Sequence, residues 1–457
     1  MSRTAALVLA ALMLAGCADY RLIRDGRIET DIAAEIKHEL VTLRGLGFER
    51  EVPLVAVAPA VAREMLVREL RREYEPDELQ RIARVYAALG LIPAGLDLER
   101  TFLDLYAGQL AGFYDPIGAR MVLVEGATAP GLMMRAVQGL LRRDLAGELI
   151  LAHELTHALQ DQHFGLDLGR AELGEDDAQL ARRAVYEGDA MLAGIGVVKG
   201  GLSPRTAVRL ARQLEGLGPQ LADAHPDVPA IVREPLVFQY VAGTNFVSWA
   251  FDQAGWTGVN ALLVNPPRST EQVLHPEKYY VRPEYPLTIR LGALAPYQRS
   301  DWHVVDETTL GELVIRILAA QFLPDERASA VAEGWDGDRM SAMIRGDEVA
   351  LVWMSAWDSE DDAREFFTAY RSILARKHGE GGAQSGGDVV VRSGAQPYYL
   401  ERRSDKVLAL EGPLEDDLTE LADRVWRRST FQATLPWIPL DMAEGARRTR
   451  PHAAIAR

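Results

Sequence analysis

The sequence predicts an α+β protein, with a mainly helical first part that contains a small antiparallel sheet and a smaller α+β domain after it. Three observations predict this fold class. Apolar residues recur at helical spacing over most of the chain between about residues 31 and 256. One hairpin pattern interrupts the helices near residues 110–125, and strand and helix patterns alternate beyond residue 302. A chain of 457 residues is longer than one core usually spans, which favours two domains.

The N-terminal residues are typical of an export signal. A single arginine precedes a short apolar run that is too short for a comfortable membrane span. The run ends in "LAGC", Leu14–Cys17, which resembles the bacterial lipobox. The resemblance implies a lipoprotein signal peptide over residues 1–16, lipidation of Cys17 and a tether over residues 17–30. The alternative is a plain secretory signal.

Composition limits the partners of the chain. Cys17 is the only cysteine, so the mature chain would have no disulfides. The net charge is −16 and no basic stripe precedes the C-terminal tail, which argues against nucleic acid as a partner. Ala18 after the cysteine favours the outer membrane, by analogy with enteric lipoproteins. We therefore expect a protein of the bacterial cell envelope, anchored to a membrane by lipid on its periplasmic side.

The first domain is predicted over residues 31–300. A hairpin is expected over Leu110–Glu125, because Asp115–Gly118 supplies turn residues between two apolar runs. Proline and aromatic residues between Pro266 and Pro286 predict an ordered, irregular loop. The other elements expected are a strand over residues 51–59 and helices over residues 30–46, 60–74, 76–89, 147–162 and 178–198, with more helices up to residue 256.

The second domain is predicted over residues 301–438, with a disordered tail over residues 439–457. It contains four expected strands, an acid-capped amphipathic helix over residues 359–377 and a final helix over residues 415–428. The alternation that includes Trp353 indicates a core strand rather than a binding surface. The glycine-rich stretch Gly379–Gly387 lies between a helix and a strand, in the wrong order for a phosphate loop, and is interpreted as a flexible connector.

The candidate chemistry lies in "LILAHELTHALQDQHF", which contains His-Glu-x-x-His. His153 and His157 are four residues apart on a predicted helix, so both imidazoles leave one face about one turn apart. That spacing suits two ligands of a tetrahedral Zn²⁺. Glu154 lies beside the pair, close enough to touch a water on the metal. The alternative is two core histidines, each with its own hydrogen-bond partner.

Two residues compete for the place of a third ligand. His163 lies ten residues after His153, the spacing found in metzincins. That pattern requires a glycine where the helix must break, whereas this chain has Gln160, a good helix former. The other candidate, Glu187, lies on the inward stripe of the next helix, where a carboxylate is costly unless it is paired or bound to metal. Gly188 beside it would permit close helix packing, and an ion pair with a nearby arginine is the alternative role for Glu187.

Two histidines and a glutamate on a following helix resemble the gluzincin class of zinc metallopeptidases, over about residues 48–286. The resemblance implies that His153, His157 and Glu187 bind zinc and that Glu154 is the general base. The gap to the third ligand is longer than in thermolysin, and the family's aspartate four residues later is missing. Asp189 or Asp161 could orient a ligand histidine instead. The stretches "GFYDP" and "STEQVLHPEKY" also resemble a group of predicted bacterial metallopeptidases.

The implied reaction is hydrolysis of peptide bonds in a peptide or protein substrate. A donor to the developing oxyanion is required, and the candidates are His275, Tyr279 and Tyr280 in the proline-rich loop. An extended substrate is expected along an exposed strand edge over Met121–Val124. The alternative function is a non-catalytic envelope lipoprotein that acts as a binding or assembly module. The intact Glu154 favours catalysis, since a structural zinc site has four protein ligands and no use for that glutamate.

Overall fold

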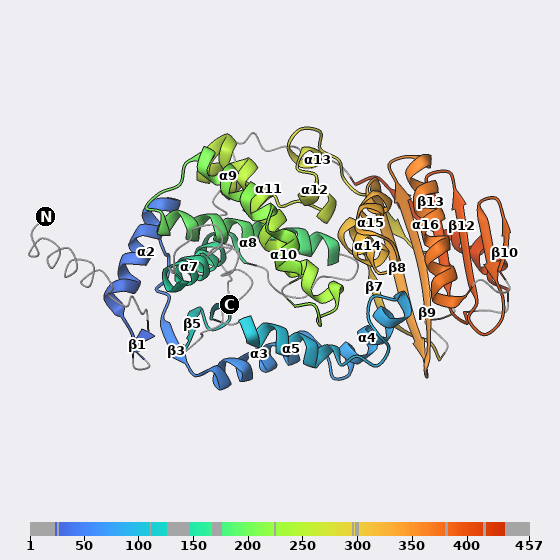
Figure 1. The fold of residues 1–457 in the computed structure, drawn as a ribbon, viewed down its shortest axis with the longest axis horizontal. Helices are drawn as coiled ribbons and strands as arrows, with labels where there is room; N and C mark the ends of the chain where they lie inside the picture. Colours follow the sequence, from blue (N-terminus) through green and yellow to red (C-terminus); the bar gives the residue numbers. More distant parts are fainter. Residues whose placement is uncertain are drawn as a thin grey trace, which may run out of the picture.

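The computed structural model describes residues 23–24, 27–109, 111–125, 146–166, 176–223, 225–294, 297, 301–379, 383–414 and 417–434. The predicted α+β class is confirmed, with a helical N-terminal part and a sheet-rich C-terminal part (Figure 1). The expected signal peptide, Cys17, most of the expected tether and the expected tail lie outside the described residues. Within the described residues, no helix is both long enough and apolar enough to cross a membrane.

Helices dominate the first part because apolar stripes at helical spacing must be buried against one another. Before the motif these helices are α2 (Thr30–Arg44), α3 (Pro59–Glu73), α4 (Glu78–Leu89) and α5 (Leu98–Gln109). The later helices are α7 (Ala146–Phe164), α8 (Asp176–Val198), α9 (Pro204–Glu215), α10 (Gly218–Ala222), α11 (Ala230–Val264), α12 (Thr270–Leu274) and α13 (Glu277–Tyr280). The proline-rich stretch expected as an irregular loop therefore contains two short helices, α12 and α13.

A three-stranded sheet lies beside α7. The expected hairpin is present as β4 (Gly112–Asp115) and β5 (Arg120–Val124), which pair in antiparallel fashion. Strand β3 (Leu54–Val57) joins β5 in parallel, so the sheet is mixed and not purely antiparallel. The order β3-β5-β4 places β5 in the centre. A short ladder of β1 (Ile23–Arg24) and β2 (Arg27–Ile28) lies near the N-terminus.

Glycines bring α8 and α11 into unusually close contact. A Cβ atom added to Gly188 would lie 2.3 Å from the backbone oxygen of Gly243, and one added to Gly243 would lie 2.1 Å from the backbone oxygen of Ala184. Real Cβ atoms are excluded at such distances, so both positions require glycine. The expectation that Gly188 permits close helix packing is confirmed, and this packing fixes the helix that carries Glu187.

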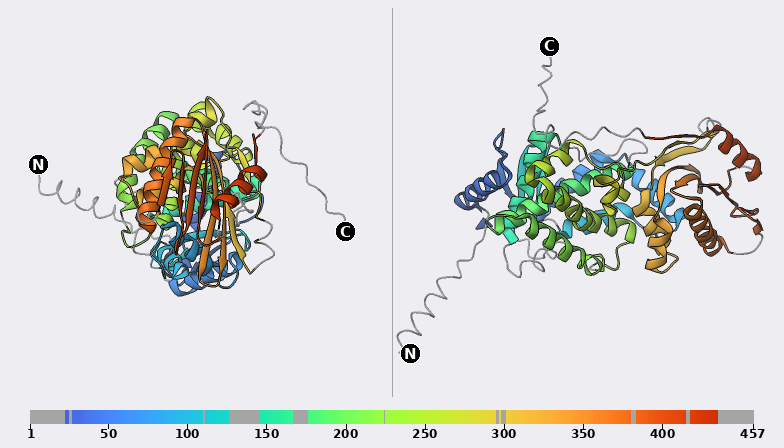
Figure 2. Two further views of the ribbon diagram at one scale, coloured as in Figure 1. Left: turned by 90° about the vertical axis from the view of Figure 1, so that its right-hand side faces the viewer. Right: turned by 90° about the horizontal axis from the view of Figure 1, so that it is seen from above.

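The C-terminal part is built on a seven-stranded antiparallel sheet of order β10-β11-β12-β13-β9-β8-β7. Helix α16 (Glu360–His378) packs on one face and α17 (Leu418–Arg428) on the other (Figure 2). The strands are β7 (His303–Thr308), β8 (Trp335–Arg345), β9 (Glu348–Trp357), β10 (Ala383–Gly386), β11 (Val389–Arg392), β12 (Tyr398–Arg403) and β13 (Lys406–Glu411).

Packing joins the two parts of the molecule. Helices α14 (Gly311–Ala320) and α15 (Asp325–Ala332) connect β7 to β8, and their apolar side chains share one core with those of α8 and α11. Strand β6 (Thr288–Arg290), which follows the helical part, pairs with β14 (Thr430–Gln432) near the described C-terminal end. Trp353 is 2% exposed, so its interpretation as core is confirmed. The expected connector over Gly379–Gly387 is corrected in part, because its second half forms β10.

Candidate metal centre

Helix α7 presents the His-Glu-x-x-His motif from a buried position. Its apolar residues Leu151, Leu155 and Leu159 are fully buried, which holds the helix against the small sheet and α8. His153 and His157 are 1% and 6% exposed. Each imidazole therefore lies in a fixed environment one helical turn from the other, as the i, i+4 spacing predicts.

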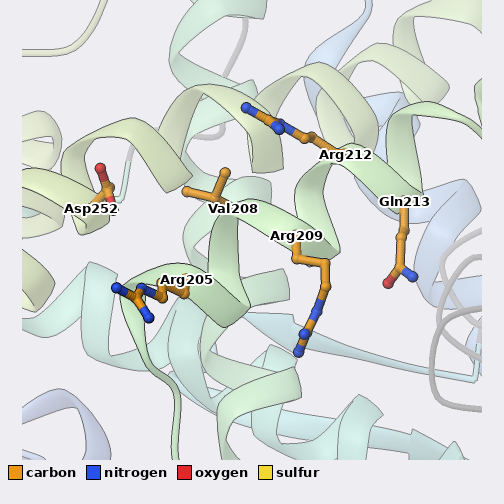
Figure 3. Close-up of a pocket in the computed structure, with 6 residues that line it drawn as sticks. All are labelled: Arg205, Val208, Arg209, Arg212, Gln213 and Asp252. Carbon is orange, nitrogen blue, oxygen red and sulfur yellow. The ribbon is translucent and has the colours of Figure 1, made fainter.

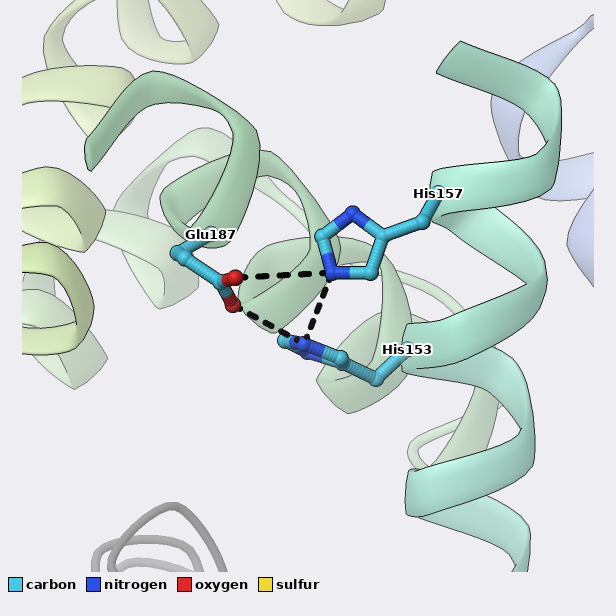
Figure 4. Close-up of side chains that lie close together, drawn as sticks. All are labelled: His153, His157 and Glu187. Carbon is cyan, nitrogen blue, oxygen red and sulfur yellow. Dashed lines mark hydrogen bonds and ion pairs between the residues drawn. The ribbon is translucent and has the colours of Figure 1, made fainter. Parts of the chain in front are cut away.

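Glu187 of α8 completes a compact group with the two histidines (Figure 4). The two Nε2 atoms of His153 and His157 lie 3.2 Å apart. Oε2 of Glu187 lies 3.1 Å from Nε2 of His153, and Oε1 of Glu187 lies 3.7 Å from Nε2 of His157. One nitrogen from each histidine and one oxygen from Glu187 lie within 4.8 Å of one another, and these three side chains, the metal-ligand group, could hold a metal ion.

The charges within the group favour a cation. Burial lowers the pKa of His157, but the carboxylates of Glu187 and Glu154 and the hydrogen bond with Gln160 together outweigh burial and raise that pKa to about 9. Burial alone raises the pKa of Glu187, but the neighbouring histidines outweigh it and hold that pKa well below its usual range. An ionised carboxylate thus lies beside an imidazole that readily accepts a proton. A metal ion that binds here takes the place of that proton.

Glu154 points to the small sheet, beside the metal-ligand group. Its Oε2 accepts a hydrogen bond of 3.0 Å from the backbone N–H of Tyr114 in β4. Burial raises the pKa of Glu154, whereas the two nearby histidines and this hydrogen bond lower it. Burial is the largest of these effects, so the pKa of Glu154 is raised. A raised pKa makes the carboxylate a stronger base than an exposed glutamate.

The strand edge beside the site is β4, not β5. We expected a free edge over Met121–Val124, but those residues belong to β5, which is paired on both sides. The expectation is therefore corrected, and the reason is that β3 adds to the hairpin in parallel. The outer edge of β4, Gly112–Asp115, faces α7, as the hydrogen bond from Tyr114 to Glu154 shows.

A chain of hydrogen bonds supports His157. Its Nδ1 lies 2.8 Å from Oε1 of Gln160, which is consistent with Nδ1–H donating and Nε2 facing the metal-ligand group. The amide of Gln160 donates to Oδ2 of Asp189 at 2.9 Å. Arg44 donates to the same oxygen at 3.1 Å, and the side chains of Arg44 and Asp189 are both fully buried. Asp189 therefore reaches the histidine through Gln160, while Asp161 instead accepts a hydrogen bond from the Tyr114 hydroxyl.

His163, the competing candidate for the third ligand, contacts the segment before β3 and not the two motif histidines. Nε2 of His163 is 2.7 Å from the backbone oxygen of Gly47, and its Nδ1 is 3.6 Å from Glu49. Helix α7 continues through Gln160 to Phe164 and does not turn back at the position where a metzincin would. The structure brings Glu187, and not His163, to His153 and His157.

The side chains expected to donate to an oxyanion have other partners, and this expectation is corrected. Nε2 of His275 lies 2.9 Å from Oε1 of Glu312. The hydroxyl of Tyr279 donates to the backbone oxygen of Asn265 at 2.5 Å, and Tyr280 is likewise bonded to a backbone oxygen of α11. These contacts hold α12 and α13 against α11 and α14. The described contacts of His275 and Tyr279 therefore stabilise the loop and include none with His153, His157 or Glu187.

Tyr240 of α11 is the hydroxyl that the sequence interpretation missed. Its ring centroid is 6.2 Å from that of His153, and its hydroxyl lies close enough to the carboxylate of Glu187 for that charge to affect its pKa. Burial raises the pKa of Tyr240 well above its usual value, and the nearby carboxylates of Glu187 and Glu154 raise it further. The phenol consequently keeps its proton and can donate it in a hydrogen bond. Its position 53 residues after Glu187 gave no motif by which to find it.

Comparisons with known proteins cover only the C-terminal part. A family described as a domain of unknown function, DUF8575, matches residues 298–422. This match includes all seven strands of the large sheet and none of the three metal-ligand candidates. No curated protein and no solved structure matches the chain. The chemical interpretation of the site depends on its own geometry.

Proposed function

We propose that this protein is a zinc-dependent peptidase of the gluzincin type, which hydrolyses peptide bonds in the bacterial cell envelope. The observation that carries the proposal is the convergence of His153, His157 and Glu187 beside the carboxylate of Glu154. Two nitrogen ligands, one oxygen ligand and an adjacent base are the set that a hydrolytic zinc site requires.

The distances fit zinc. Ligand atoms about 2.0–2.1 Å from a tetrahedral ion lie roughly 3.4 Å from one another. The two histidine nitrogens lie 3.2 Å apart, and the two carboxylate oxygens of Glu187 approach them at 3.1 Å (Oε2 to His153) and 3.7 Å (Oε1 to His157), all close to that value. Apart from its ion-pair contact with Nε2 of His153, the buried Oε2 of Glu187 has no hydrogen-bond partner within the described residues, so a metal ion between these two atoms could bind it. The ion would be held by His153, His157 and Glu187.

The residues around the metal-ligand group have different roles in the proposed hydrolysis. Zinc, when bound, supplies Lewis acidity that activates water and polarises the substrate carbonyl. Glu154 accepts the proton of the attacking water and passes it to the leaving amine. The Tyr240 hydroxyl donates a hydrogen bond to the oxyanion, in place of His275 and Tyr279. The edge of β4, over Gly112–Asp115, is the proposed position of an extended peptide.

The number of ligands favours catalysis over a structural role. A structural zinc site is closed by four protein ligands, whereas three leave one position for water or substrate. Within the described residues, the group contains three metal-binding side chains. A structural site would also have no use for a buried glutamate such as Glu154. A binding or assembly lipoprotein without catalysis is the function that would remain if hydrolysis were not found.

The test is hydrolysis of a quenched fluorescent peptide library by zinc-loaded protein from Ala18 onward, compared with Glu154→Gln. Glu154→Gln should keep its zinc and lose about 10²–10⁴-fold in kcat, the usual contribution of a general base. Tyr240→Phe should keep its zinc and lose about 10²–10³-fold in kcat, with a smaller change in KM. Equal activity in wild type and Glu154→Gln would contradict the assigned mechanism. No hydrolysis by the zinc-loaded wild type would favour the binding lipoprotein.

A further inference from the structure

A basic hollow lies on α9, apart from the metal-ligand group. Its volume is about 450 Å³, and Figure 3 shows three arginines spaced along α9 with Asp252 on the neighbouring α11. The lining residues are Arg205, Val208, Arg209, Arg212, Gln213 and Asp252. The arginines are at positions i, i+4 and i+7, so they follow the outer face of the helix.

These arginines are exposed, and their guanidinium groups are not used to hold the fold. Arg205, Arg209 and Arg212 have no ion pair or hydrogen bond with another side chain within the described residues, while the opposite face of α9 buries Ala207 and Leu210. Many other arginines of the described chain are paired with a carboxylate, as expected for a protein of net charge −16. These three unpaired arginines therefore form a positively charged patch on a protein whose net charge is negative. Such a patch favours an anionic partner.

An exposed tryptophan adjoins the same surface. Trp249 lies three residues before Asp252 on α11, which makes the two side chains neighbours on that helix. Its side chain is 37% exposed and stacks on Tyr280, with ring centroids 5.8 Å apart and an angle of 9° between the rings. The stack holds the indole in place at the surface. Indole rings beside basic side chains are typical of surfaces that lie at the boundary between water and lipid.

We propose that Arg205, Arg209, Arg212 and Trp249 form a docking surface for the headgroups of an anionic phospholipid bilayer. The arginines would contact phosphate groups, and Trp249 would enter the headgroup layer. Helix α9 lies in the same half of the molecule as α2, the first helix after the expected tether, and away from the seven-stranded sheet (Figure 1). A lipid at Cys17 and this surface would together act as two membrane contacts, which is what stable anchoring requires.

The proposal is tested by cosedimentation of the chain from Ala18 onward, which lacks the lipid site, with lipid vesicles. Binding is expected with vesicles that contain phosphatidylglycerol and not with pure phosphatidylcholine vesicles. Replacing Arg205, Arg209 and Arg212 by glutamine should weaken binding on the order of 100-fold, since each basic residue near an anionic surface contributes about a fivefold factor. Raising the salt to about 1 M should have a similar effect. Trp249→Ala should weaken binding at both salt concentrations.

A matched variant separates this surface from overall charge. Replacing Arg63, Arg72 and Arg100 by glutamine removes the same charge from α3 and α5, and it should leave vesicle binding unchanged. Equal losses in the two triple variants, or no preference of the wild type for anionic vesicles, would overturn the proposal. The proposal would also be overturned if the protein bound soluble polyglutamate more tightly than the vesicles, and if that binding required the three arginines. That result would indicate an acidic protein as the partner. Circular dichroism of each variant checks that these exposed substitutions leave the fold intact.

Discussion

Replacing Arg44 by methionine should destabilise the protein strongly, although Arg44 is not a ligand. Its guanidinium donates to Asp189 at 3.1 Å and to Asn260 at 3.0 Å, and it lies 4.4 Å from the centroid of the Trp256 ring. The side chains of Arg44 and Asp189 are both fully buried, so removal of the cation leaves a buried carboxylate without its charged partner. Breaking such a pair on one side costs about 3–5 kcal/mol of unfolding free energy.

The assay is urea unfolding followed by circular dichroism. The double variant Arg44→Met, Asp189→Leu should recover most of the loss, because no unpaired charge remains buried. Arg63→Met is the control, since the Arg63 side chain is 49% exposed and its ion pair with Asp104 is a surface pair; it should change stability by less than about 0.5 kcal/mol. The reasoning would be refuted if Arg44→Met had the unfolding free energy of the wild type. It would also be refuted if the double variant were no more stable than Arg44→Met.

Three further predictions concern the support of the site. Gln160→Leu should weaken zinc binding about 10–100-fold, measured by competition with a chelating dye, while Gln162→Leu on the same helix should not. Gly188→Ala should lower the unfolding free energy by about 1–3 kcal/mol, because its Cβ would meet a backbone oxygen of α11 at 2.3 Å, whereas Gly216→Ala, whose Cβ has no neighbour nearer than 3.5 Å, should not. Burial raises the pKa of Asp177 to about 8, so the folded state binds this proton more tightly than the unfolded state. Its contribution to stability is therefore lost as the pH rises from about 4 to 8, and Asp177→Asn should flatten that slope in urea titrations.

The histidine pair and its helix could be predicted from the sequence because they depend on local spacing. Four residues of helix place His153 and His157 on one face whatever surrounds them. Glu187 could be predicted because it interrupts an apolar stripe, and a lone carboxylate on an inward face needs a partner. Both signals are readable within a single helix.

The support of the site could not be predicted in the same way. Arg44 and Asp189 are 145 residues apart, and nothing in the sequence around either one indicates the other. Gln160 was recognised as a helix former, but its contact with His157 depends on a rotamer that α8 and Asp189 select. Tyr240 enters the site through the packing of α11 on α8, which two glycines make possible.

The misassigned residues have a common physical cause. His275 and Tyr279 belong to a stretch rich in polar and aromatic side chains, which is typical of both catalytic loops and well-ordered loops. Only the fold shows that their polar groups are already hydrogen bonded to Glu312 and to the backbone of Asn265. The free edge expected on β5 was wrong for a similar reason. A hairpin is visible in the local pattern, whereas the parallel addition of β3 depends on residues more than 60 positions earlier.

The most direct test of the central claim is the zinc content of the chain from Ala18 onward, measured by mass spectrometry after purification under metal-replete conditions. We expect about one zinc per wild-type chain, retention of zinc in His163→Ala and loss of zinc in Glu187→Ala. Retention in Glu187→Ala, loss in His163→Ala or absence of zinc from the wild type would contradict the claim.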